Sequence, residues 1–194
     1  QDYEVDAMFG LSMLKSGALR RFACWIERKL LNSFDFVSTI SDGMMQCALK
    51  KSIDRNKLLF FPNWSEIERF KNVSKSSALL KDLGVDTNKK IVLYSGNMGE
   101  KQGLESVVRV AKIMESRSDI HFLMVGQGAA KEKLKSLADS LSLRNISFFP
   151  LQSYEKLPEL LASADCHLVI QKSGAADAVL PSKLTNILAV GGNS

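Results

Sequence analysis

The sequence contains few of the residues on which disulfide, redox or metal chemistry depends. It has three cysteines and two histidines among its 194 residues. The cysteines are odd in number, widely spaced and set among apolar residues, so we expect reduced thiols of a cytosolic protein and no metal site. His121 and His167 each begin an apolar segment, which predicts a structural role for both.

Long apolar runs and signature loops are also absent. No apolar stretch approaches the roughly 20 residues of a membrane span, and the opening residues do not follow the pattern of a signal peptide. The glycines lack the spacing of a dinucleotide fingerprint, and no Walker loop is present. Basic runs interleaved with aromatic residues are missing, so we expect no nucleic-acid partner. The net charge of +5 instead favours an anionic partner, such as a phosphorylated substrate or an acidic membrane surface.

The length and composition allow a sizeable core, in one domain or in two small ones. The chain does not begin with methionine, and it ends in G-G-N-S directly after a helix-like segment. We therefore expect an internal fragment of a longer protein, with part of the active site outside this sequence.

Strand-like and helix-like segments alternate along most of the chain. Residues 34–40 and 58–61 predict strands on either side of a helix at 42–51, which Ser41 would cap. Further strands are expected at 91–94, 120–125, 146–149 and 166–170, and helices at 104–114, 131–141, 154–164 and 182–190. This alternation predicts a parallel sheet covered by helices on both faces. The polar stretch 66–88, with one short helical patch at 79–83, predicts a domain boundary.

Residues 11–34 follow a helical pattern in which basic side chains lie beside an apolar stripe that includes Trp25. The basic residues considered for membrane contact are Arg20, Arg21, Arg28 and Lys29. Two interpretations stay open. The segment is either an ordinary surface helix whose apolar stripe faces the core, or a basic amphipathic helix that makes a peripheral contact with an anionic membrane.

The chain is organised around the stretch I-V-L-Y-S-G-N-M-G-E-K-Q-G-L at residues 91–104. A short apolar strand runs there through three glycines into a helix, and Lys101 lies in the loop. This arrangement points backbone N–H groups and the positive end of a helix dipole at the space above the strand, which suits phosphate. It is equally typical of the ordinary strand–loop–helix unit of an α/β protein.

Ligands of parallel α/β sheets bind at the carboxyl ends of the strands. The loops at those ends contribute Gly126, Gly128 and the segment P-S-K at 181–183. Glycine backbone allows close approach, Lys183 offers a point charge, and Ser182 can donate to phosphate oxygens or simply cap the last helix. Together these loops predict a site for a nucleotide diphosphate.

Four segments, taken in order, resemble a known family. They are S-G-N-M-G-E-K-Q-G-L at 95–104, L-M-V-G-Q-G at 123–128, S-A-D-C-H-L-V-I at 163–170 and P-S-K-L-T-N-I-L-A-V-G at 181–191. Their order is similar to the donor-binding domain of GT-B fold glycosyltransferases, especially the retaining family 4 enzymes of the colanic-acid exopolysaccharide type. The segments F-V-S-T-I-S-D-G-M at 36–44 and F-F-P-N-W at 60–64 resemble the end of the acceptor-side domain.

The resemblance implies an α/β fold of GT-B type. A Rossmann-like parallel-sheet donor domain would occupy residues 67–194, truncated at its end, after the end of a second Rossmann-like domain at 1–66. By position it implies a set of donor-binding residues, and the catalytic residues stay unknown. The set is Gly96, Asn97, Lys101, Gln102, Gly103, Gly126, Gly128, Ser182, Lys183 and Asn186.

The family often carries two glutamates, at positions held here by Ala178 and Asn186. Asn186 can still hydrogen-bond a ribose hydroxyl, whereas Ala178 cannot contact a sugar as a carboxylate would. Asp177 is a neighbour that could substitute. The identity of the donor sugar is therefore not implied.

The resemblance implies transfer of a sugar, with retention, from a nucleotide-diphosphate sugar to a polysaccharide or polyprenyl-linked glycan. No metal or other cofactor is expected, and the enzyme would work in the cytoplasm, at the inner face of the cytoplasmic membrane if the helix at 11–34 binds lipid. Two alternatives stay open. One is a nucleotide-sugar epimerase of GT-B fold, and the other is a non-catalytic module that binds a nucleotide sugar.

Overall fold

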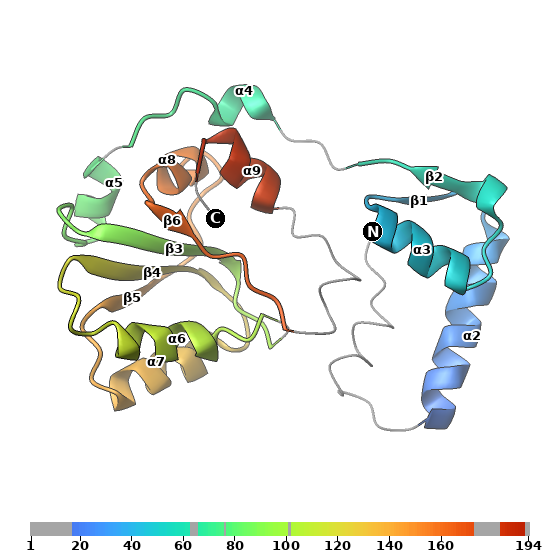
Figure 1. The fold of residues 1–194 in the computed structure, drawn as a ribbon, viewed down its shortest axis with the longest axis horizontal. Coiled ribbons are helices and arrows are strands. Elements are labelled where there is room, and N and C mark those ends of the chain that lie inside the picture. Colours follow the sequence, from blue (N-terminus) through green and yellow to red (C-terminus); the bar gives the residue numbers. More distant parts are fainter. Residues whose placement is uncertain (1–16, 63–65, 76, 101, 173–182, 193–194) are drawn as a thin grey trace. The chain divides into compact units, whose positions relative to one another are not determined.

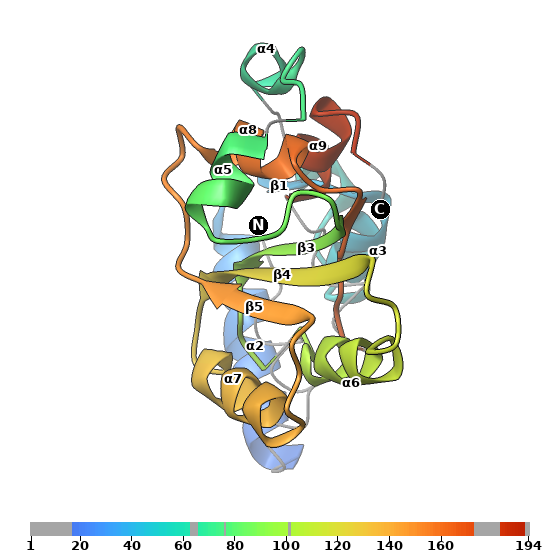
Figure 2. The same ribbon diagram turned by 90° about the vertical axis from the view of Figure 1, so that its left-hand side faces the viewer.

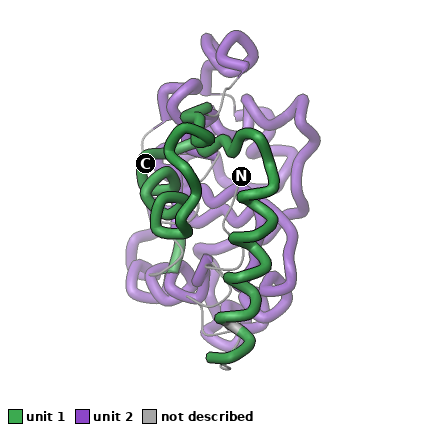
Figure 3. The backbone as a smooth tube through the Cα atoms, turned by 90° about the vertical axis from the view of Figure 1, so that its right-hand side faces the viewer, with its two compact units in different colours: residues 1–64, 171–181 green, residues 65–170, 182–194 purple. Residues whose placement is uncertain are grey.

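The computed structural model of the chain describes residues 17–62, 66–75, 77–100, 102–172 and 183–192. The chain divides into two compact units (Figure 3). The first comprises residues 1–64 and 171–181, and the second comprises residues 65–170 and 182–194. The described residues contain no helix with the length and apolar content needed to cross a membrane.

The first unit is built on a parallel β-α-β motif. Its described elements are α2 (Gly17–Ser33), β1 (Val37–Thr39), α3 (Asp42–Lys50), η1 (Arg55–Lys57) and β2 (Leu58–Phe60). Strands β1 and β2 pair in parallel, with Val37 opposite Leu58. The hydroxyl of Ser41 accepts a hydrogen bond from the Met44 amide at 3.2 Å, so the predicted cap of α3 is confirmed.

Strand β1 is shorter than the predicted strand at 34–40, because only Val37, Ser38 and Thr39 pair with β2. The Lys57 ammonium donates to the carbonyl oxygens of Asn32 and Phe34, at 3.2 Å each. These bonds satisfy carbonyl groups at and just after the end of α2. An ion pair between Lys51 and Glu27 joins α3 to α2. Between the helices and the strands lies a small apolar core of Val37, Ile40, Met44, Ala48, Ile53 and Leu58.

The second unit contains a four-stranded parallel sheet in the order β5-β4-β3-β6. Its strands are β3 (Lys90–Asn97), β4 (Ile120–Gln127), β5 (Ile146–Phe149) and β6 (Cys166–His167). Its helices are α4 (Ile67–Phe70), α5 (Ser77–Asp82), α6 (Glu105–Ile113), α7 (Lys131–Ser140), α8 (Leu157–Ala162) and α9 (Lys183–Ala189). The predicted alternation and parallel pairing are confirmed. Helix α4 was not predicted, because one turn carries too little periodicity to be recognised.

Helices cover both faces of this sheet, as Figures 1 and 2 show: α6 and α7 lie on one face, and α8 and α9 lie on the other. Side chains of a strand point alternately to the two faces. Tyr94 and Met124 therefore pack in the core under α6 and α7, whereas Leu93 and Leu123 pack in the core that includes residues of α8 and α9. Burial on both faces explains the continuous apolar runs of these strands.

Two strands are longer than predicted and one is shorter. The ladder between β3 and β4 continues through the pairs Gly96–Gly126 and Asn97–Gln127, so these four residues belong to strands and not to loops. Glycine ended the predicted strands, but glycine can extend a ladder where two backbones approach closely. Strand β6 ends at His167 because only Cys166 and His167 pair with β3.

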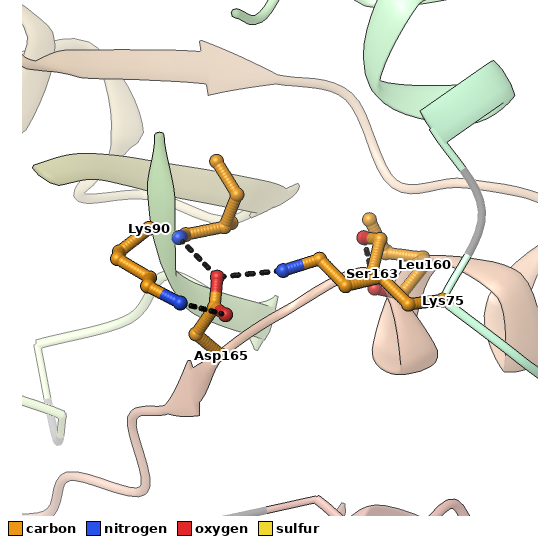
Figure 4. Close-up of polar contacts among 6 residues, drawn as sticks. Lys75, Lys90, Leu160, Ser163 and Asp165 are labelled. Carbon is orange, nitrogen blue, oxygen red and sulfur yellow. Dashed lines mark hydrogen bonds and ion pairs between the residues drawn. The ribbon is translucent and has the colours of Figure 1, made fainter. Parts of the chain in front are cut away.

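Asp165 fastens β6 to the amino end of β3 (Figure 4). Its carboxylate accepts hydrogen bonds from the Ile91 amide and the Lys75 ammonium, both at 2.8 Å, and lies 3.5 Å from the Lys90 ammonium. Burial alone would raise the pKa of this carboxyl, but these hydrogen bonds and positive charges lower the pKa overall. Part of the S-A-D-C-H-L-V-I segment is therefore structural.

The two histidines lie within the sheet. His121 on β4 shares a 2.9 Å hydrogen bond with the Ser147 hydroxyl on β5. His167 is buried on β6. Burial lowers the pKa of both side chains, so both are neutral near pH 7. These positions support the structural role predicted for each.

Candidate functional site

The candidate site lies at the carboxyl edge of the four-stranded sheet, where β3 and β4 end side by side. A Cβ atom added to Gly126 would lie 1.9 Å from the Gly96 carbonyl oxygen, and one added to Gly128 would lie 2.5 Å from the Asn97 side-chain oxygen. The sequence predicts close approach of a ligand to these glycines. In the structure the group that approaches them is the protein's own β3 strand and the residues that follow it.

The loop from β3 to α6 is held mainly by backbone hydrogen bonds to the end of β4 and the residues that follow it. The Met98 amide donates to the Gln127 carbonyl at 2.8 Å, and the Ala130 amide donates to the Met98 carbonyl at 2.9 Å. The side-chain oxygen of Gln102 accepts a hydrogen bond from the Gly99 amide at 3.1 Å. These contacts connect the ends of both strands and fix the shape of the edge.

Lys183, the first residue of α9, reaches over this edge. Its ammonium lies 4.0 Å from the centre of the Tyr94 ring and 3.4 Å from the place where a Gly96 side chain would begin. The side chain is partly buried. Burial lowers the pKa of Lys183 to about 8, so the ammonium is mostly charged at pH 7.

No carboxylate among the described residues forms an ion pair with Lys183. A buried charge is normally paired, because removing it from water is costly. A partly buried cation at a strand-end edge, with no carboxylate partner in the described part of the chain, is suited to binding an anionic ligand.

Tyr94 lies beneath Lys183 and is fully buried. Its hydroxyl donates to the Asn97 carbonyl at 2.6 Å, at the start of the glycine loop. Burial raises the pKa of Tyr94 to about 12, so the phenol is neutral and stays a hydrogen-bond donor at physiological pH. The sequence alone did not predict a role for Tyr94, because it occupies one position of an apolar run that predicts a buried strand.

Lys131 is a second cation that sequence reasoning missed at this edge. Its ammonium donates to the carbonyl oxygens of Gly126 and Phe149, at 3.0 Å each. It therefore ties the end of β4 to the end of β5. The signal available in the sequence is a lysine placed just after the G-Q-G segment, at the start of a helix.

The structure places most of the predicted donor-binding residues. Gly96 and Lys183 lie against each other, and Asn97, Gln102, Gly103, Gly126 and Gly128 form the adjoining strand ends and loops. Asn186 is partly buried on α9, three residues after Lys183. Lys101 and Ser182 lie outside the described residues, as do Asp177 and Ala178. No group of three or more metal-binding side chains gathers in the part of the chain that the structure describes.

A family model described as "Glycosyl transferases group 1" matches residues 75–193. A curated relative from Escherichia coli K12, "Putative colanic acid biosynthesis glycosyl transferase WcaI", is 54% identical over 100% of this chain and 49% of the relative. The chain belongs to the group 1 glycosyl transferases. It spans about half the length, or less, of the curated relatives that it matches.

Solved structures of other proteins share the fold of this group 1 member. Anabaena HepE in complex with UDP-glucose matches with a TM-score of 0.72 and 16% identity, over 87% of this chain and 46% of HepE. A glycosyltransferase from Rickettsia africae matches with a TM-score of 0.70 and 20% identity, over 85% of this chain and 46% of that one. The α/β fold of GT-B type expected from the sequence is confirmed.

Proposed function

We propose that this chain supplies the nucleotide-sugar site of a glycosyltransferase. The enzyme moves a sugar, with retention, from a nucleotide-diphosphate sugar to a polysaccharide or polyprenyl-linked glycan in exopolysaccharide synthesis. The observation that carries the donor site is the Lys183 ammonium, which has no carboxylate partner among the described residues and lies at the strand-end edge of a group 1 glycosyl transferase. The name of the E. coli relative supports the pathway class, and the UDP-glucose bound to HepE supports the donor class.

The proposed chemistry follows from charge. The diphosphate gains negative charge as the bond to the sugar breaks, and a fixed cation stabilises that charge without rearranging. Lys183 supplies this cation from α9, and its ammonium lies beside the strand end at Gly96. We propose that the nucleotide sugar is the only small molecule the reaction requires besides the acceptor.

Titration of nucleoside diphosphates tests this proposal directly. We expect the full-length protein to bind one member of a panel of UDP, GDP, ADP and dTDP, and Lys183→Ala to weaken that binding by about tenfold or more. The reason is the loss of one charge-assisted contact of roughly 1.5–3 kcal/mol. Isothermal calorimetry measures both effects.

Lys135→Ala is the matched control, because Lys135 is an exposed lysine of the same unit on α7. It should bind like the wild type. If no diphosphate binds, or if Lys183→Ala binds as tightly as the wild type, the donor site is not at this edge. Analysis of the sugar product in the presence of a glycan acceptor distinguishes a transferase from an epimerase. If the protein binds a diphosphate but turns over no nucleotide sugar, it is a non-catalytic binding module.

We also propose that helix α2 contacts the inner face of the cytoplasmic membrane. It exposes Phe22 and Trp25, whose rings stack with centres 6.2 Å apart. Beside them Arg21 and Arg28 line a cavity of about 410 Å³ together with Cys24, Trp25, Lys50 and Lys51. Basic residues next to exposed aromatic rings are typical of helices that lie on anionic lipid.

Vesicle co-sedimentation of the full-length protein tests this contact. Neutralising Arg21 and Arg28 to serine should weaken binding to vesicles rich in anionic lipid by about tenfold or more, since each basic residue near such a surface contributes roughly 1 kcal/mol. The control removes two exposed lysines of the other unit, Lys81→Ala with Lys135→Ala. Equal sedimentation of both double variants would make α2 an ordinary packing helix.

A further inference from the structure

We propose that Tyr94 is the positioning residue for Lys183 in the donor site. The face of its ring holds the lysine ammonium over the carboxyl end of β3, and its hydroxyl fixes the start of the glycine loop through the Asn97 carbonyl. The proposal rests on the proposed donor site. It concerns how the free protein holds this cation, which has no carboxylate partner among the described residues, ready for a diphosphate.

The contact has the geometry of a cation–π interaction. The ammonium lies 4.0 Å from the ring centre, within the roughly 6 Å over which the negative face of an aromatic ring attracts a cation. The interaction strengthens when both groups are shielded from water, and Tyr94 is fully buried. Gly96 contributes by lacking a side chain, since the ammonium lies 3.4 Å from the position that a Cβ atom would take.

Among the described residues, the charged side chains on helices next to α9 do not form an ion pair with Lys183. Helices α4 and α8 pack against α9. Their charged side chains are Glu68, Arg69 and Glu159, and none of them forms an ion pair with Lys183. Burial is the cause of the lowered pKa of Lys183. Among the described residues, the negative face of the Tyr94 ring is therefore the group that favours the charged lysine.

Tyr94 also links two parts of the edge that are far apart in sequence. Its ring contacts the first residue of α9, while its hydroxyl binds the carbonyl group that begins the β3–α6 loop. The side chain is buried and its hydroxyl is hydrogen-bonded, and both restrict the orientation of the ring. A rigid ring offers the lysine one position before any ligand arrives, which lowers the ordering cost of binding.

The test keeps the shape of the ring and changes only its electrostatics. Full-length proteins carry Phe, 3,5-difluorophenylalanine or pentafluorophenylalanine at position 94, with Phe as the reference because all three lack the hydroxyl. Fluorine removes negative charge from the ring face and leaves packing nearly unchanged. The readouts are the ionisation midpoint of Lys183, followed by NMR of ¹³C-labelled lysine and assigned with Lys183→Arg, and calorimetric affinity for the diphosphate that the wild type binds.

Fluorination should lower the Lys183 midpoint in the ligand-free protein by on the order of 0.5–1 pH unit, because the charged form loses its attraction to the ring. Affinity at pH 8 should fall by about threefold to tenfold across the series. A side chain with a purely structural role would change neither quantity, because the three rings fill the same space. Tyr94→Phe itself should weaken affinity by a few-fold without lowering the midpoint, since it releases the Asn97 carbonyl and keeps the ring.

A midpoint and an affinity that stay constant through the series would overturn the proposal. In proteins that also carry Lys183→Met, fluorination of the ring should have no effect on diphosphate affinity. A loss of affinity there equal to the loss with Lys183 present would also overturn the proposal. If the midpoint falls with fluorination but no diphosphate binds to any variant, Tyr94 positions Lys183 as inferred and the proposed donor function is what fails.

Discussion

Gly126→Ala is expected to destabilise the second unit by about 3 kcal/mol or more and to abolish nucleotide binding. The added methyl group would lie 1.9 Å from the Gly96 carbonyl oxygen and 3.0 Å from its carbon. Both atoms are backbone, so no side chain can rotate away and the β3–β4 ladder must open. Overpacked side chains in a core typically cost 1–3 kcal/mol, and a backbone clash is harder to relieve. Urea denaturation of the full-length protein measures the change.

Gly17→Ala is the control for this substitution. Gly17 lies in α2 with no heavy atom within 4 Å of the added methyl group. The urea midpoint of the Gly17→Ala protein should therefore equal that of the wild type or be slightly higher. A Gly126→Ala protein with the wild-type midpoint would mean that the two strand ends are farther apart than the structure has them. In that case the G-Q-G segment would be free to approach a ligand, as the sequence alone predicts.

The order of strands and helices could be predicted from sequence because burial on both faces leaves a local pattern. Apolar runs such as I-V-L-Y, separated by helices with one apolar stripe, are determined by residues close together in the chain. Strand ends were less predictable. Gly96 and Gly126 read as loop residues, whereas each continues its strand because the other is also a glycine. That pairing joins residues 30 positions apart and has no local signal.

The candidate site was predictable only where its residues leave a local signal in the sequence. Lys183 was found because it belongs to a P-S-K segment after a strand end, and Gly96 because it interrupts an apolar run. Tyr94 and Lys131 were missed, since their roles depend on contacts across the sheet edge. The Tyr94 ring meets a lysine 89 positions later, and Lys131 bonds carbonyl groups of two different strands. Only the three-dimensional structure brings these groups together.

The affinity for the nucleoside diphosphate is expected to fall by about tenfold per pH unit above pH 8. Burial lowers the pKa of free Lys183 to about 8, and the oxygens of a bound diphosphate would raise it again by favouring the ammonium. Below pH 8 the lysine is charged in both states, so affinity is constant. Above pH 8, Lys183 must take up a proton when the diphosphate binds. This requirement lowers the affinity progressively until the pH passes the pKa of Lys183 in the complex. Calorimetry between pH 7 and 9.5, in two buffers of different ionisation enthalpy, measures affinity and proton uptake together.

Neither the ligand phosphates nor Tyr94 titrates in this range, which makes the assignment to Lys183 testable. The phosphates of the ligand are already ionised, since their last pKa is near 6, and burial raises the pKa of Tyr94 to about 12. Lys183→Arg is the matched variant, because a guanidinium stays charged throughout. Its affinity should be constant from pH 7 to 9.5 and exceed that of the wild type at the alkaline end. A wild-type affinity that does not change with pH, or an arginine variant that loses affinity in parallel, would show that the cation at this edge is not what the diphosphate binds.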